Sequence, residues 1–87
     1  KLAPGNASIA DSLGWAYHLT GDTPRALPLL ESAAQAESGN AEIAEHLGDA
    51  YWTLGRRYEA RYAWKAAAVL ADAKDKGRLS TKLARGL

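Results

Sequence analysis

The chain repeats itself with a period of 34 residues. Residues 6–17 (NASIADSLGWAY) align with residues 40–51 (NAEIAEHLGDAY), and eight of these twelve pairs are identical. Four more identical pairs follow at the same offset: Gly21 with Gly55, Ala26 with Ala60, Ala33 with Ala67, and Ala34 with Ala68. A fixed period of this length indicates stacked units, because one such unit cannot bury its apolar face alone.

The spacing of apolar residues predicts that each unit is a pair of helices. Ile9, Leu13 and Tyr17 recur every four residues and therefore lie on one helical face. Asp22 stands two residues before Pro24, as a helix N-cap followed by an early proline would. We expect helices near 7–20, 24–37, 41–54 and 58–71. Gly14 and Gly48 recur inside the first helix of each unit, which predicts close backbone approach there.

These residues carry a resemblance to a known family. The tetratricopeptide repeat (TPR) pattern reads W-x2-L-G-x2-Y, then A-x3-F, then P. The first unit has Ala10-x2-Leu13-Gly14-x2-Tyr17 and Ala26-x3-Leu30, and the second has Ala44-x2-Leu47-Gly48-x2-Tyr51 and Ala60-x3-Trp64. Alanine replaces the first Trp, and Ser38 and Asp72 replace the closing Pro. Residues 6–73 thus resemble two TPR units, which implies an all-α, right-handed superhelix of antiparallel helix-turn-helix repeats.

The repeat also divides the chain. We expect one unit at residues 6–39 and a second at 40–73. Pro4 lies one period before Ser38, so residues 1–5 are interpreted as the remnant of an upstream repeat. Residues 74–87 leave the repeat register but keep leucines four residues apart, with Lys82 and Arg85 between them. A C-terminal capping helix, with an apolar face on the last unit and a basic face in water, is favoured over a membrane-surface helix.

Composition argues against several classes of function. The chain has no cysteine, and His18 and His46 are its only histidines. Without a nucleophile elbow or a glycine-rich phosphate loop, we expect no enzyme and no cofactor. His18 could approach His46 and Asp49, but their spacing is not that of a metal site. A net charge of +1 argues against nucleic acid, and no apolar run is long enough to insert into a membrane.

The resemblance to TPR proteins predicts a concave binding groove formed by the first helix of each unit. The predicted groove residues are Asp11, Trp15, His18, Leu19, Glu42, Glu45, His46, Asp49 and Trp52. Asp11 and Glu45 stand where chaperone-tail-binding members carry lysines, so we do not expect a carboxylate ligand. This acidic and aromatic set favours a basic or apolar protein segment. Trp15 and Trp52 are expected on the inner wall, where they contact either a partner or a neighbouring repeat, whereas Trp64 is expected in the core.

The leading functional hypothesis is therefore a protein–protein interaction scaffold or adaptor. Two alternatives remain open: a structural cap that closes a longer solenoid, and self-association through exposed ends of the array. The amino-acid sequences of the repeats resemble the C-terminal repeats of proteobacterial TPR proteins, some of which are exported or lipid-anchored at the outer membrane. This resemblance implies the bacterial cytoplasm or a periplasmic, outer-membrane-associated location.

Overall fold

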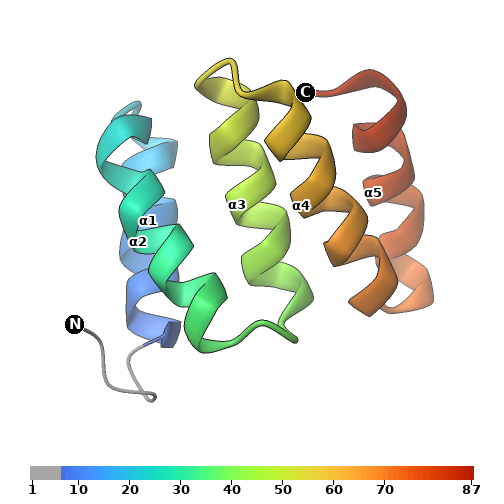
Figure 1. Ribbon diagram of the computed structural model, residues 1–87, viewed down its shortest axis with the longest axis horizontal. Coiled ribbons are helices and arrows are strands. Elements are labelled where there is room, and N and C mark those ends of the chain that lie inside the picture. The colour runs from blue at the N-terminus through green and yellow to red at the C-terminus, as the bar shows by residue number, and fades with distance from the viewer. Residues whose placement is uncertain (1–6) are drawn as a thin grey trace.

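The computed structural model describes residues 7–87, and these residues form five helices and no strand (Figure 1). The helices are α1 (Ala7–Leu19), α2 (Thr23–Ala36), α3 (Ala41–Thr53), α4 (Arg57–Leu70) and α5 (Ala73–Arg85). The first four begin and end within one residue of their predicted positions, and α5 lies in the predicted capping segment. The all-α class is confirmed, while the predicted remnant at residues 1–5 lies outside the described residues.

Short turns join the two helices of each pair. Gly21 and Gly55 occupy equivalent places in these turns, with φ of 91° and 81°, a conformation that favours glycine. Asn40 caps the N-terminus of α3, because its Oδ1 accepts a hydrogen bond from the backbone N–H of Ile43 at 3.1 Å. Asp22 precedes α2 as predicted, but its carboxylate caps no backbone N–H. That carboxylate instead lies 3.4 Å from the guanidinium of Arg25 in the first turn.

The two helices of each pair approach closely at a glycine. A Cβ added to Gly48 would lie 2.5 Å from Nε1 of Trp64, and one added to Gly14 would lie 3.0 Å from Cγ of Leu30. Both distances are shorter than ordinary van der Waals contact. The predicted close approach at Gly14 and Gly48 is therefore confirmed, and it places a large side chain of the second helix against the backbone of the first.

The core follows the stacking of the helix pairs. Trp64, Leu30 and Leu79 are the largest fully buried side chains, so the predicted core position of Trp64 is confirmed. Ile43 of α3 is 2% exposed because it packs against Ala33 of α2 and Ala10 of α1. The pairs α1–α2 and α3–α4 thus lie side by side, with α5 beside α4 at the far end of the row (Figure 1).

Leu13 is an exception to the predicted core. The spacing of apolar residues places it on the same helical face as Tyr17, the face that each unit is expected to bury, yet it is 47% exposed. Its repeat equivalent, Leu47, packs against the cluster that includes Leu27 and Leu30 of α2. Within residues 7–87 no helix takes the corresponding position next to α1, so the same side chain that is covered in the second unit is open in the first.

Candidate functional site

Part of the predicted groove forms a stack of aromatic rings between α1 and α3. The indole of Trp15 lies against the imidazole of His46, with ring centroids 3.9 Å apart and planes inclined by 12°. His18 also stacks on Trp15, with centroids 5.0 Å apart. Asp11 holds His46 from the other unit, since its Oδ1 lies 2.8 Å from Nδ1 of the imidazole. The structure therefore brings four predicted residues, from both units, into one cluster, which we call the Trp15 stack.

The His18 imidazole lies at one end of the Trp15 stack, and a second contact holds it there. Its Nδ1 lies 3.1 Å from the hydroxyl oxygen of Thr23, a buried residue at the start of α2. Burial lowers the pKa of His18 below its usual value, and the nearby charge of Asp49 opposes this shift only in part. His18 is therefore neutral at pH 7, and the Trp15 stack carries little positive charge on this ring.

Two other predicted groove residues remain open to solvent. The side chain of Glu42 is 76% exposed, and its carboxylate lies 4.0 Å from Nε2 of His46. Leu19, at the last position of α1, is 66% exposed. A carboxylate and an aromatic cluster next to each other can bind a segment that combines a basic and an apolar side chain.

The remaining acidic groove residues are not open. Glu45 and Asp49 are 7% and 6% exposed, because α5 covers this part of α3. Arg78 of α5 binds Glu45 through two hydrogen bonds of 2.6 and 2.8 Å. Lys82 of α5 lies 2.7 Å from Glu45 and 2.9 Å from Asp49. The expectation of an open acidic wall at these two positions is therefore wrong, since the chain neutralises them with its own cations.

The electrostatics of these buried carboxylates follow from their partners. The hydrogen bonds from the Arg78 guanidinium, reinforced by Lys82, outweigh burial and hold the pKa of Glu45 at about 2. Asp49 accepts a further hydrogen bond of 2.9 Å from the indole Nε1 of Trp64. Glu45 therefore links α3 to α5, and Asp49 links α3 to both α4 and α5.

Trp52 also differs from its predicted position on the inner wall. Its indole is half-buried and packs in the cluster of Trp64 and Leu79, with the two indole centroids 5.5 Å apart. The guanidinium groups of Arg57 and Arg61 lie 4.8 and 5.0 Å from its ring centroid. The repeat register alone placed Trp52, like Trp15, on the inner wall, but the side chain turns toward α4 and the end of α5.

Sequence reasoning missed the contribution of α5 to this region. Lys82 was assigned to a solvated face, and Arg78 was not singled out. A signal was nevertheless present, because Glu45 and Asp49 are four residues apart in α3 and Arg78 and Lys82 are four residues apart in α5. Two helices with opposite charges at equal spacing can pair side by side.

Other comparisons of the chain give no further assignment. Within residues 7–87, no group of three or more His, Asp or Glu side chains is placed to hold a metal ion. None of the helices in this range has the length and apolarity that a bilayer crossing requires. Comparisons with models of protein families, with curated proteins and with solved structures found no match.

Proposed function

We propose that the chain is a non-catalytic protein–protein interaction scaffold of the TPR type, whose repeats form a right-handed superhelix. The 34-residue period, the two helix pairs and the glycine contacts at equivalent positions support this assignment. In such scaffolds, binding residues stand on rigid helices whose spacing is set by repeat stacking. The partner is a protein or a peptide, and a segment with basic and apolar side chains fits the proposed site.

The Trp15 stack is the observation that carries this proposal. Its three aromatic rings come from two units, and the exposed carboxylate of Glu42 lies next to them. Trp is enriched among the residues that dominate binding energy, and the contacts with His46 and His18 restrict the Trp15 ring before a partner arrives. A basic side chain next to Glu42 and an apolar side chain against Trp15 would use both features.

The position of α5 supports a structural cap as a second candidate function. Leu79 of α5 is 1% exposed, and Arg78 and Lys82 satisfy the acidic residues of α3. A helix with this role closes the last repeat unit, and a partner would then bind elsewhere in a longer array. The two candidates differ in whether the Trp15 stack binds anything.

A selection of displayed random peptides against the immobilised chain tests the proposal. We expect enriched peptides with Lys or Arg next to apolar residues, whose binding weakens at least about tenfold in Trp15→Ala and Glu42→Lys. Thermal melts of both variants serve as the folding control. If the enriched peptides bind both folded variants with the same affinity as the original chain, the Trp15 stack is rejected as the site and the cap is favoured.

A further inference from the structure

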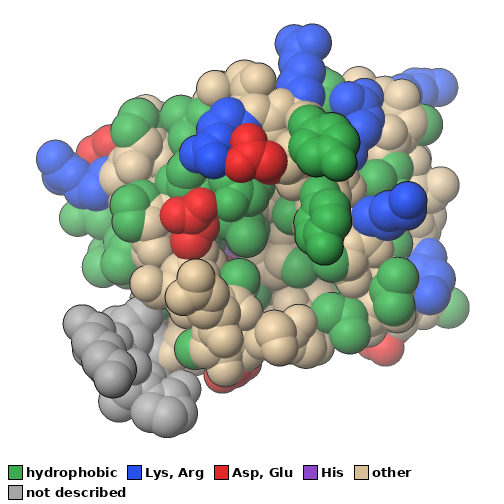
Figure 2. Space-filling view, viewed as in Figure 1, with side chains coloured by type: hydrophobic (Ala, Val, Ile, Leu, Met, Phe, Trp, Pro, Cys, Tyr) green, Lys and Arg blue, Asp and Glu red, His purple; other side chains and the backbone are tan. Residues whose placement is uncertain are grey.

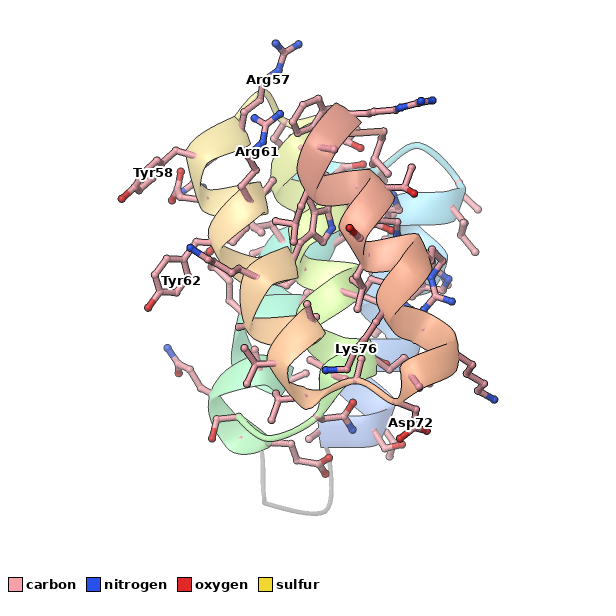
Figure 3. The ribbon with its side chains drawn as sticks, turned by 90° about the vertical axis from the view of Figure 1, so that its right-hand side faces the viewer. Arg57, Tyr58, Arg61, Tyr62, Asp72 and Lys76 are labelled. Carbon is pink, nitrogen blue, oxygen red and sulfur yellow. The ribbon has the colours of Figure 1, made fainter. Side chains whose placement is uncertain are left out.

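Two tyrosines on α4 are almost fully exposed. Tyr58 and Tyr62 have 84% and 74% of their surface open to solvent. They are one helical turn apart and extend in the same direction away from α4 and α5 (Figure 3). Neither belongs to a buried cluster, so folding alone does not account for two large aromatic side chains at these positions.

The two tyrosines form a ridge between two hollows. One hollow of about 400 Å³ has an apolar floor, made by Ala34, Ala44, Leu47, Ala63 and Ala66. The other, of about 520 Å³, is lined by Arg61, Lys65 and Leu83. Tyr58 and Tyr62 line both hollows. Figure 2 shows this face, where hydrophobic side chains gather over α4 with Lys and Arg side chains next to them.

The second hollow carries unneutralised positive charge. Within residues 7–87, no carboxylate lies at ion-pair distance from Arg57, Arg61 or Lys65, whereas Arg56 pairs with Glu59. Arg61 is also held in place, because its guanidinium stacks over Trp52 and its Nε donates a 3.2 Å hydrogen bond to the carbonyl oxygen of Leu83. A cation that is ordered before binding loses less entropy when it pairs with an anion.

We propose that this tyrosine ridge is a second docking surface, and that it binds an acidic protein segment with a bulky apolar side chain. Carboxylates of the segment would pair with Arg61 and Lys65, and its apolar side chain would enter the hollow above Leu47. This surface is separate from the Trp15 stack and prefers the opposite charge. The proposal therefore does not depend on the proposed function.

The charge distribution favours an acidic peptide over a nucleic acid. Glu59 lines the apolar hollow, on the other side of the ridge from Arg61 and Lys65. A phosphate backbone that crossed the ridge would meet no unpaired cation among the described residues on this side, since Arg56 neutralises Glu59, and it would leave the apolar floor uncovered. A peptide can place its carboxylates on the basic side only.

The displayed-peptide selection also tests this proposal when its clones are sorted with different variants. We expect one group of clones to combine Asp or Glu with Leu, Phe or Trp, and to lose at least about tenfold in affinity in both Tyr62→Ala and Lys65→Glu. Lys76→Glu makes the same charge change on α5 and Val69→Ala trims another exposed apolar residue of α4, and both controls should change affinity less than about twofold. Trp15→Ala should leave these clones unaffected.

Five outcomes would overturn the proposal. The first three are that no clone depends on Tyr62 and Lys65, that the dependent clones are basic, and that their binding is lost in Trp15→Ala. Single-stranded DNA that competes fully with a synthetic copy of the acidic peptide, and needs the same two residues, would show a polyanion site instead. The last outcome is a dimer, detected by light scattering, that dissociates in Tyr62→Ala. Such a dimer would assign the ridge to a second copy of the chain.

Discussion

At the scale of single residues, the contact between Gly48 and Trp64 determines how closely α3 and α4 pack. The indole of Trp64 is fully buried and is anchored by its hydrogen bond to Asp49. It cannot move away from the Gly48 backbone without breaking that bond. At Gly14 the neighbouring side chain is Leu30, which no hydrogen bond anchors and which can yield more easily.

Gly48→Ala is therefore expected to destabilise the protein. Helix propensity alone would favour alanine by about 1 kcal/mol, so a net loss would identify the steric conflict with Trp64. We expect the free energy of unfolding in urea to fall by about 1–3 kcal/mol, as for other overpacked cores. Gly77→Ala is the matched control, because Gly77 also lies inside a helix and no atom lies within 4 Å of the added Cβ. Equal stability of the two variants would contradict the contact.

At the scale of helices, α5 is attached by charge as well as by apolar packing. Leu79 enters the core, and Lys82, only 15% exposed, lies between two buried carboxylates. Removal of one partner from a buried ion pair is costly, because it leaves the other charge without compensation.

Lys82→Met tests this attachment, since methionine keeps much of the side-chain volume without the charge. We expect the free energy of unfolding to fall by about 2–3 kcal/mol, somewhat less than for a fully buried pair. Lys74→Met, at an exposed position of the same helix, should change it by less than about 0.5 kcal/mol. Similar losses in both variants would mean that Glu45 and Asp49 do not need this cation.

The pKa values predict how stability depends on pH. The lowered pKa of His18 means that the unfolded chain binds the proton more readily, so stability decreases as the pH falls below the ordinary value of 6.5. Glu45, with a pKa of about 2, adds stability that is complete above pH 4.5 and is lost as the pH falls toward 2. In urea titrations across this range, His18→Gln should flatten the upper part of the profile and Glu45→Gln the lower part. A profile that neither substitution alters would contradict both assignments.

At the scale of the whole molecule, part of the core is made where the two units meet. Ile9 and Ile43 occupy the same position of the repeat, yet Ile9 is 65% exposed and Ile43 is 2% exposed. The difference arises because α2 covers α3, while no described helix covers α1 in the same way.

Ile43→Ala should accordingly lower the free energy of unfolding by about 2–5 kcal/mol, the usual cost of a large-to-small change in a core. Ile9→Ala should lower it by less than about 0.5 kcal/mol. Chemical denaturation of both variants measures the contrast directly. Comparable losses would show that α1 is covered in solution.

The same comparison explains what could be predicted from the sequence. The helix boundaries follow from local signals such as Asn40, Gly21 and Gly55, and the repeat supplies each of these signals or its equivalent in both units. Trp52 was placed incorrectly because its indole turns toward Trp64 of α4. Lys82 was placed incorrectly because it belongs to α5, which has no counterpart in the repeat. Their contacts depend on the packing of helices that are distant in sequence.

The Trp15 stack also has an optical consequence. A protonated imidazole in contact with an indole is an efficient quencher of its fluorescence, whereas a neutral imidazole quenches weakly. Trp15 lies against two imidazoles, while the rings next to Trp52 and Trp64 are indoles. With Trp52 and Trp64 replaced by phenylalanine, the emission of Trp15 would therefore report on the protonation of His18 in the folded protein.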